Sequence, residues 1–322
     1  MSSVATNQVR RAVIDIGTNS IKLLVGDVAD GQVDPVLEDS EQTRLGAGFY
    51  ETHELKPQAI AQTATAVAAF ADKARELKAI STRVIATSAA RDAKNSHELT
   101  SAIEKSSGLK VEIISGEQEA DWAFQGVTSD PELAQQPLLL LDVGGGSAEF
   151  ILGQGESKHF RESFQLGTVR LLEKLTVSDP PTARELAACR EKVKTFLEST
   201  VVPKLGPALK KETKMDTEHR AVQLVGTGGT TTILARMEAR LNSYDRERIE
   251  ATRLSLEQVQ AHAEKLWALS LAERKNIVGL PKKRADVILP GVVIYEGIME
   301  TFGFKELRIS TRGLRFAALM TQ

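Results

Sequence analysis

Acidic residues stand beside glycine turns at two places in the chain. AVIDIGTNSIKLLV at 12–25 and LLLDVGGGSAEFIL at 139–152 share one pattern: an apolar run, an aspartate, a glycine, small residues, a serine and a second apolar run. The aligned pairs are Asp15 with Asp142, Gly17 with Gly144 and Ser20 with Ser147. Because glycine has no side chain, successive backbone N–H groups in such a turn can approach an anion closely. Each stretch therefore predicts a phosphate-binding turn, although a tight turn without a ligand would explain either one alone.

A third glycine cluster follows at 225–233, in VGTGGTTTI. It lies between an expected strand and an expected helix, and the dipole at a helix N-terminus also favours phosphate. Its candidate binding residues are Gly226, Gly228, Gly229 and Thr230. The chain has no G-x-x-x-x-G-K-[ST] motif, and GTGGTT lacks the third glycine and the following acid of a dinucleotide fingerprint. The three turns thus favour a phosphate cradle of another type.

Carboxylates beside these turns raise an electrostatic problem. Asp15, Asp142 and Glu149 would repel a phosphate group unless a divalent cation lay between them. Mg²⁺ is typically held by one or two carboxylates together with phosphate oxygens. Turn capping would equally explain Asp15 or Asp142, but it suits Glu149 less well, because this acid interrupts an apolar strand. We therefore expect a Mg²⁺ site in which Mn²⁺ can substitute.

A general base would be needed if water attacks the phosphate. ISGEQEADWAFQGV at 114–127 predicts a helix that begins after Ser115, with Gln118 in the capping-box position. Glu117 and Glu119 flank the apolar stripe of this helix on opposite sides, and periodicity does not choose between them. Either acid could instead compensate the helix dipole.

The elements that must position these residues alternate between strands and helices. Expected strands cover 10–17, 20–28, 82–88, 110–115, 137–144 and 147–155; expected helices cover 58–78, 96–108, 116–127, 183–205, 254–269 and 285–303. A strand, a glycine turn and a helix are expected over 221–241, and the helix over 183–205 is expected to end near Pro203. The two similar glycine turns indicate internal duplication and two similar α/β domains whose turns face one another.

Composition bounds the class of protein. At 322 residues, with 42% hydrophobic and 26% charged residues, the chain suits a two-domain globular protein. Neither an apolar run of about 20 residues nor a signal peptide is present, so no membrane association is expected. The net charge of −2 gives no general attraction to nucleic acid. The single cysteine, Cys189, lies on the apolar stripe of its helix, which predicts a buried, inert thiol in a cytoplasmic protein.

The chain resembles the exopolyphosphatase and guanosine pentaphosphate phosphohydrolase family, within the superfamily of actin, sugar kinases and heat-shock chaperones. The resemblance runs over nearly the whole chain. The stretches that carry it are DIGTNS, RLGAGF, ATSAARDAKN, ISGEQEA, LDVGGGSAEF, GTGGTTT, RADVILPG and ISTRGLR. It implies two actin-like (ribonuclease H-like) domains with mixed sheets flanked by helices and an active site in the cleft between them. Domain I would cover 1–124, with the C-terminal helix at 312–322 as a candidate to complete it, and domain II would cover 125–322.

The resemblance also assigns roles to residues. It implies Glu119 as the catalytic base and Asp142 and Glu149 as the Mg²⁺ ligands, and it places Arg91 as a basic, phosphate-binding residue that points into the cleft. The implied phosphate-binding residues are Asp15, Gly17, Thr18, Asn19 and Ser20 in the first loop and Gly144, Gly145, Gly146 and Ser147 in the second. Ala148 departs from the family, in which many members carry threonine. The chain also stops without the C-terminal helical extension of the long members, so it resembles their short form.

The function implied is exopolyphosphatase activity, the metal-dependent hydrolytic release of terminal orthophosphate from inorganic polyphosphate by a cytoplasmic homodimer. Three alternatives remain open: a guanosine pentaphosphate phosphohydrolase, a phosphotransferase that binds adenine nucleotides through GTGGTTT, and a non-catalytic actin-like sensor. Two basic runs are candidates to guide a polyphosphate chain, although solvated surface would explain them as well. They are Lys282, Lys283 and Arg284 in one run and Lys204, Lys210, Lys211 and Lys214 in the other.

Overall fold

The chain divides into two compact units, each with its own sheet and core. The computed structural model describes residues 8–215 and 221–322, with the backbone alone for 213–215. The first unit contains the chain up to Ser129 together with Arg312–Gln322, and the second unit contains Asp130–Thr311. No helix in these described ranges is both long and apolar enough to cross a membrane.

The first unit is built on a five-stranded sheet in the order β3-β2-β1-β4-β5. Its strands are β1 (Val9–Ile16), β2 (Ile21–Ala29), β3 (Gln32–Glu41), β4 (Ser81–Ala86) and β5 (Val111–Ile113). The first three pair antiparallel, whereas β4 runs parallel to β1 and β5 parallel to β4. Its helices are α1 (Phe49–Thr52), α2 (Pro57–Glu76), α3 (Ser88–Asp92), α4 (Ser96–Ser107), α5 (Gly116–Thr128) and α15 (Leu314–Met320).

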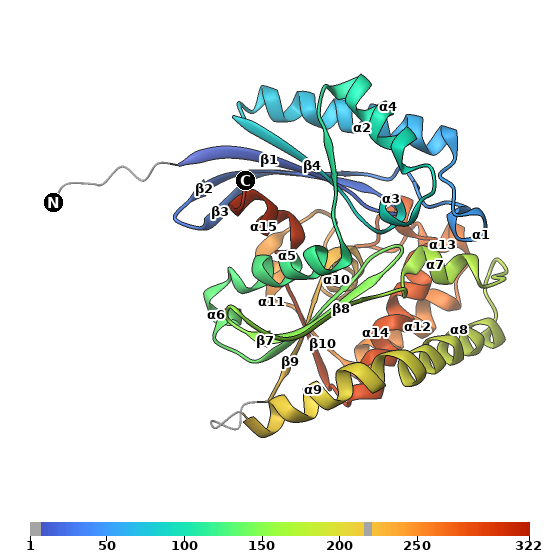
Figure 1. The fold of residues 1–322 in the computed structure, drawn as a ribbon. Coiled ribbons are helices and arrows are strands. Elements are labelled where there is room, and N and C mark those ends of the chain that lie inside the picture. The colour runs from blue at the N-terminus through green and yellow to red at the C-terminus, as the bar shows by residue number, and fades with distance from the viewer. Residues whose placement is uncertain (1–7, 216–220) are drawn as a thin grey trace. The chain divides into compact units, whose positions relative to one another are not determined.

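Successive residues of β1 face opposite sides of this sheet and belong to two apolar clusters. Ile14 lies in the cluster that includes α2, whereas Val13 lies in the cluster that includes α15. α15 packs against α5 and β1, and it can be followed beside α5 in Figure 1. The sheet of the first unit is therefore buried on both faces, and the last residues of the chain belong to its core.

The second unit has a six-stranded sheet in the order β10-β11-β9-β6-β7-β8. Its strands are β6 (Leu138–Val143), β7 (Ala148–Gln154), β8 (Ser157–Phe164), β9 (Gln223–Thr227), β10 (Arg253–Ser255) and β11 (Glu306–Ile309). Its helices are α6 (Pro131–Ala134), α7 (Thr168–Glu173), α8 (Ala183–Phe196), α9 (Val202–Met215), α10 (Gly228–Glu238), α11 (Arg246–Ala251), α12 (Leu256–Trp267), α13 (Leu271–Arg274), the 3₁₀ turn η2 (Lys282–Arg284) and α14 (Ile288–Phe302). One large core joins the sheet to α8, α12 and α14.

The two sheets repeat one strand order. β3-β2-β1-β4-β5 of the first unit has its counterpart in β8-β7-β6-β9-β11 of the second, with an antiparallel triple followed by two parallel strands in each case. The similarity of the stretches 12–25 and 139–152 indicates internal duplication. The repeated strand order extends this similarity over both sheets.

The expected end of the long helix near Pro203 is wrong. α8 continues through a π-helical turn (Leu197–Val201) into α9, which carries Pro203 and Pro207 and extends to Met215. Pro203 is the second residue of α9, and the π-helical turn before it changes the hydrogen-bond spacing where the proline has no N–H to donate. Gly206 precedes Pro207, and a residue without a side chain reduces the crowding that a following proline causes.

The expected burial of Cys189 is confirmed. Its side chain is fully buried with Leu186 and Val193 beside it in the core. Burial raises the pKa of the Cys189 thiol to about 12, so the thiolate form is suppressed at neutral pH.

Candidate active site

The first glycine turn joins β1 to β2 and is closed by a hydrogen bond from Gly17 N to Ser20 O, at 3.1 Å. The segment that follows β3 is hydrogen-bonded to this turn. Gly46 N donates to Thr18 O at 2.7 Å, and Arg44 N donates to Asn19 O at 2.9 Å. These contacts fix two carbonyl groups of the turn in the first unit.

The second glycine turn joins β6 to β7 and is closed in the same way, by Gly144 N donating to Ser147 O at 2.9 Å. Here the support comes from the start of α7. Thr168 N donates to Gly144 O at 3.0 Å, and the N–H groups of Val169 and Arg170 donate to Gly145 O at 2.9 and 3.1 Å. The Arg170 side chain adds a bond from Nε to Gly146 O, at 2.7 Å.

Two supporting glycines allow these close approaches. A methyl group built on Gly46 would lie 2.3 Å from Thr18 Cγ2, and one built on Gly167 would lie 2.4 Å from Gly145 O. Each glycine follows a leucine shortly after the third strand of its unit, in RLGAG at 44–48 and QLGTV at 165–169. Sequence reasoning missed Gly167 and Arg170, and this recurring Leu-Gly pair was the signal that could have found them.

The acids beside the two turns have different cross-strand neighbours. Asp15 lies opposite Lys22 on β1 and β2, whereas Asp142 lies opposite Glu149 on β6 and β7. Directly opposed residues of an antiparallel pair lie on one face, with Cβ atoms about 5 Å apart. Glu149 is only 1% exposed, and its Oε1 accepts a hydrogen bond from Ser163 Oγ at 2.7 Å. The second unit therefore places two negative charges opposite each other beside its turn, whereas the first unit pairs one negative with one positive charge.

Asp142 and Glu149 fit the ligand set that a Mg²⁺ ion requires. Two carboxylates lie side by side next to a turn of backbone amides, and Mg²⁺ is usually bound by one or two carboxylates and by phosphate oxygens. No group of three or more His, Cys, Asp or Glu side chains that could hold a metal ion occurs within residues 8–215 and 221–322.

The third glycine turn lies against Asp142. β9 runs parallel to β6 with Thr227 beside Asp142, and α10 begins at the next residue, Gly228. Gly228 has a φ of +88°, and a methyl group there would lie 2.4 Å from Asp142 Oδ1. Only glycine combines this left-handed backbone with such a close approach. A methyl group on Gly229 would lie 2.9 Å from a guanidinium nitrogen of Arg284.

Two residues predicted for phosphate binding in this turn have packing contacts in the core. Gly226 lies inside β9, and the space left by its missing side chain is taken up by Thr231 and Tyr295. Thr230 is 1% exposed and faces Gly291 of α14. Gly228 and Gly229 are the glycines of this cluster that lie at the turn.

The Tyr295 hydroxyl lies between β6 and β9, close enough to Asp142 to be affected by its negative charge. The ring is fully buried, and its hydroxyl donates to Leu141 O at 3.2 Å. Burial raises the pKa of Tyr295 well above its usual value, and the negative charge of Asp142 adds to this effect. The phenol therefore stays neutral and donates a hydrogen bond to the backbone of β6.

Glu119 and Arg91 form an ion pair in the first unit. Arg91 Nη1 lies 2.9 Å from Glu119 Oε2 and also donates to Ile114 O at 3.1 Å. The Glu119 side chain is 12% exposed, whereas Glu117 is an exposed residue. Ser115 caps α5 by accepting a hydrogen bond from Gln118 N, as the sequence predicts. Arg91 follows β4 and Glu119 follows β5, just as the first glycine turn follows β1. Because these three strands are parallel, all of these residues lie at the same edge of the sheet, beyond the C-terminal ends of the strands.

Two polar atoms beside the first turn have no hydrogen-bond partner in the described part of the chain. They are Asn19 Nδ2 and Ser88 Oγ, and both are buried. The Asn19 amide is oriented by Gln42 Nε2, which donates to Asn19 Oδ1 at 3.1 Å. Buried polar groups are normally paired, so unsatisfied ones beside a glycine turn suit a site that binds an anion or water.

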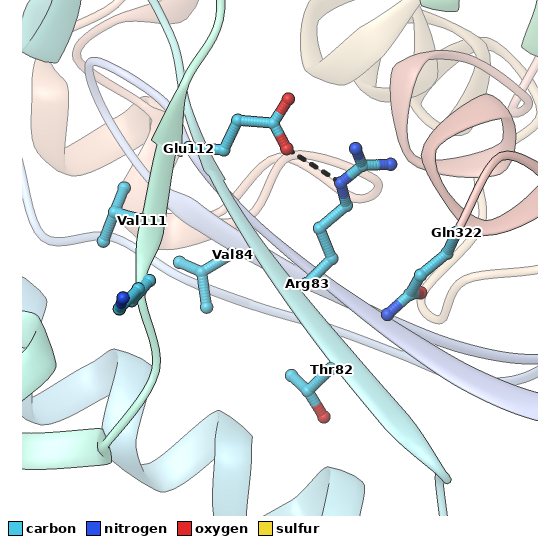
Figure 2. Close-up of a pocket in the computed structure, with 7 residues that line it drawn as sticks. Thr82, Arg83, Val84, Val111, Glu112 and Gln322 are labelled. Atoms are coloured by element: carbon cyan, nitrogen blue, oxygen red, sulfur yellow. Dashed lines mark hydrogen bonds and ion pairs between the residues drawn. The ribbon is translucent and has the colours of Figure 1, made fainter.

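A separate hollow of the first unit lies away from the glycine turn. It has a volume of about 380 Å³, and Figure 2 shows Arg83 of β4 pointing toward Glu112 of β5 across it. Arg83 Nε donates to Glu112 Oε2 at 2.9 Å. The described residues that line it are Thr82, Arg83, Val84, Lys110, Val111, Glu112 and Gln322, and no predicted site residue is among them.

Comparison with known proteins places the chain among phosphatases. The model of the Ppx/GppA phosphatase family matches residues 24–321. Exopolyphosphatase 2 of Mycobacterium tuberculosis is 32% identical over 314 residues, which cover 94% of each protein. A guanosine-5'-triphosphate,3'-diphosphate pyrophosphatase of Photobacterium profundum is 28% identical over 304 residues, which cover 94% of this chain and 57% of that protein.

Solved structures agree with this result. An exopolyphosphatase from Cytophaga hutchinsonii superposes with a TM-score of 0.83 at 26% identity, covering 97% of each chain. The Aquifex aeolicus member of the Ppx/GppA family superposes with a TM-score of 0.75 at 29% identity, covering 98% of this chain and 97% of that one. The predicted fold class, two similar α/β units with mixed sheets flanked by helices, is thereby confirmed. The chain belongs to the Ppx/GppA phosphatase family.

Proposed function

We propose that the chain is an exopolyphosphatase, which releases terminal orthophosphate from inorganic polyphosphate by metal-dependent hydrolysis. The observation that carries this proposal is the opposed pair of Asp142 and Glu149 beside a glycine turn. Such a pair suits a metal-bound phosphate chain and would repel a phosphate without the metal. The similarity to exopolyphosphatase 2 of Mycobacterium tuberculosis supports the same reaction.

The first unit would supply the base. Glu119 would accept a proton from the attacking water, and Arg91 holds one carboxylate oxygen of Glu119 so that the side chain keeps a single orientation. Backbone N–H groups and the Asn19 amide of the first turn would bind phosphate oxygens.

The second unit would supply the electrostatic part of the reaction. Asp142 and Glu149 would hold Mg²⁺, for which Mn²⁺ can substitute. When bound, the ion would offset charge on the phosphoryl oxygens. The turn from Gly144 to Ser147 and the start of α10 at Gly228 would add backbone donors. Phosphoryl transfer depends mainly on such positioning and charge stabilisation.

Guanosine pentaphosphate is the second candidate substrate, and the similarity to the Photobacterium profundum enzyme favours it. A guanine base usually needs a stacking or hydrogen-bonding surface. Trp122, Trp267 and Tyr295 are all buried in the cores, so these aromatic side chains are not available to stack on a base. Tyr244, at 45% exposed, is an aromatic side chain at the surface, but both tryptophans are buried, and this scarcity of stacking surface favours polyphosphate as the main substrate.

A phosphotransferase or a non-catalytic sensor would also use the glycine turns. Phosphate release from purified protein distinguishes them, with polyphosphate, guanosine pentaphosphate and ATP offered in parallel. An exopolyphosphatase releases phosphate from polyphosphate without any nucleotide, and it does so fastest with that substrate. Release that required a nucleotide acceptor would indicate a phosphotransferase, and no release from any of the three would contradict the proposal.

Location and assembly are part of the same proposal. The single, buried cysteine suits the reducing cytoplasm. The homodimer expected from the sequence stays a prediction, which light scattering of the purified chain would check.

A further inference from the structure

Arg170 is a buried cation that bonds to the backbone of the second glycine turn. It is 8% exposed. Its Nε donates to Gly146 O at 2.7 Å, and its Nη1 donates to Gln165 Oε1 at 3.3 Å. The same residue also donates its backbone N–H to Gly145 O. A buried guanidinium is costly to desolvate, so this placement suggests a role beyond filling space.

The contacts from α7 fix the direction of each peptide group in the turn. Thr168 N binds Gly144 O, Val169 N and Arg170 N bind Gly145 O, and Arg170 Nε binds Gly146 O. In a trans peptide the C=O of one residue and the N–H of the next point in opposite directions. Anchoring these carbonyls on the α7 side therefore turns the N–H groups of Gly145, Gly146 and Ser147 away from α7.

The first turn is held in a corresponding way by different groups. Its Thr18 and Asn19 carbonyls, which match those of Gly145 and Gly146, accept hydrogen bonds from the backbone N–H groups of Gly46 and Arg44. In the second turn the Arg170 side chain holds the last of these carbonyls. That anchor can be removed by substitution while the backbone of α7 stays the same.

We propose that Arg170 is a positioning residue for the proposed hydrolysis, which orients the backbone donors of the second turn toward the phosphoryl group. The inference rests on the proposed function and adds to it a residue that does not touch the substrate. Without the Nε bond, the peptide between Gly146 and Ser147 is free to rotate, and Ser147 N loses its fixed direction. Glycines on either side of Gly145 oppose such rotation only weakly.

The test compares Arg170→Lys and Arg170→Ala with the wild type in kcat and KM for polyphosphate. Lysine keeps the charge but not the geometry of the guanidinium, so both variants should lose activity. We expect kcat to fall about 10- to 100-fold while KM changes less than about threefold, because donors aimed at developing charge act mainly in the transition state. Guanidinium ion at millimolar concentration should restore part of the kcat of Arg170→Ala and leave that of Arg170→Lys unchanged.

Arg190→Lys is the matched control. Arg190 lies in the same unit and also binds acceptors with its guanidinium, but these belong to Glu296 and Glu264, away from the turn. Arg190→Lys should lower the melting temperature, and it should leave kcat unchanged at temperatures where the protein stays folded. Gly167→Ala is a second perturbation, because its methyl group would lie 2.4 Å from Gly145 O and would displace the turn without removing a charge.

Three results decide the matter. A wild-type kcat in Arg170→Lys, or a loss that matches Arg190→Lys at equal melting temperature, would overturn the role of Arg170. If the wild type released no phosphate, the proposed function would fail. Binding of orthovanadate, which mimics the five-coordinate phosphoryl group, to the wild type and to Arg170→Lys would still test the turn. An affinity at least about tenfold weaker in the variant, about 1.4 kcal/mol, supports the role, and equal affinities contradict it.

Discussion

Asp142 and Glu149 occupy directly opposed positions on β6 and β7, and the corresponding positions of the first unit hold Asp15 and Lys22. The two turns share their strand order and their closing hydrogen bond, but they differ in charge at this opposed position. Opposed like charges destabilise an antiparallel pair, whereas opposed unlike charges stabilise it. The second turn gains from a cation, and the first does not need one.

Metal binding should therefore depend on the second turn. Mg²⁺ should raise the melting temperature of the wild type, and Glu149→Gln or Asp142→Asn should abolish most of this increase, because each removes one of two opposed carboxylates. Chelation should also stop phosphate release, and Mg²⁺ or Mn²⁺ should restore it. Calorimetric melting curves with and without Mg²⁺ provide the measurement.

The control for metal binding is Asp15→Asn in the first unit. It should keep the Mg²⁺-dependent increase in melting temperature, whatever it does to phosphate release. Equal loss of the increase in Asp15→Asn and Asp142→Asn would contradict a metal site confined to the second turn, and full turnover in excess chelator would contradict metal dependence altogether.

Glu119→Gln should lower the rate of hydrolysis by roughly 10²–10⁴-fold, because the amide cannot accept a proton from water. The variant keeps the size of the side chain and an oxygen that can accept a hydrogen bond from Arg91. Polyphosphate binding should survive and can tighten, since one negative charge is removed. Single-turnover phosphate release and equilibrium binding measure the two effects separately.

Glu117→Gln is the matched control, on the same turn of α5 but exposed. Its rate should stay within about twofold of the wild type, as surface substitutions away from a site usually have little effect. If the two variants behaved alike, the base would have to be sought elsewhere.

The turns and the acids beside them could be predicted because their pattern is local. Asp142 and Glu149 are separated by a short turn, so the residue types and the strand on each side are visible in one stretch of sequence. Their direct opposition was not predicted, because it depends on the turn closing between Gly144 and Ser147. The choice of Glu119 over Glu117 came from family resemblance, and only the structure adds the bond to Arg91.

The support of the second turn could not be predicted in this way. Arg170 contacts Gly146 across 24 positions in the sequence. In the sequence alone, this arginine cannot be distinguished from the exposed basic residues that are common in helices. β3 was missed for a different reason. Its sequence, QVDPVLEDSE, is polar and contains Pro35, as expected of an edge strand that avoids pairing with other chains.

Arg190 and Glu296 provide a prediction about stability. Glu296 is 2% exposed, and Arg190 binds both of its carboxylate oxygens, at 3.0 and 2.7 Å. Burial raises the pKa of Glu296, and the Arg190 charge opposes this increase. Arg190→Met should lower the free energy of unfolding by about 3 kcal/mol at about pH 8, because it leaves a buried carboxylate unpaired.

The sign of the pH dependence follows from the raised pKa. The folded protein then binds a proton at Glu296 more readily than the unfolded chain does, so stability is lost as the pH rises through the folded-state pKa. The deficit of Arg190→Met should shrink between about pH 8 and pH 5, as measured by urea unfolding. Arg190→Met combined with Glu296→Leu should recover most of the stability at about pH 8. A deficit independent of pH would show that lost packing, and not the carboxylate charge, is responsible.

The two basic runs differ in what surrounds them. Lys282 lines a hollow of about 380 Å³ together with Arg236 and Lys275, whereas Lys204 on α9 is paired with Glu162. Arg236 Nε is buried and has no hydrogen-bond partner among the described residues. The first run also ends at Arg284, whose guanidinium lies next to Gly229 of the third turn. The Lys214 side chain lies outside the described part of the chain.

Lys282→Glu combined with Lys283→Glu should therefore raise the KM for polyphosphate about five- to tenfold at low salt, since exposed charge pairs contribute up to about 1 kcal/mol each. The KM for guanosine pentaphosphate should rise less, because a shorter ligand extends past fewer of these cations. The effect should diminish as salt is added, because screening weakens the attraction between exposed charges.

Lys210→Glu combined with Lys211→Glu is the matched control. It makes the same change of charge on α9 and should alter neither KM by more than about twofold. Steady-state phosphate release at several chain lengths is the measurement, and the effect should grow from short to medium chains before it levels off. Equal increases in KM for both substrates, or equal effects of the two double substitutions, would mean that the run at Lys282 is ordinary solvated surface.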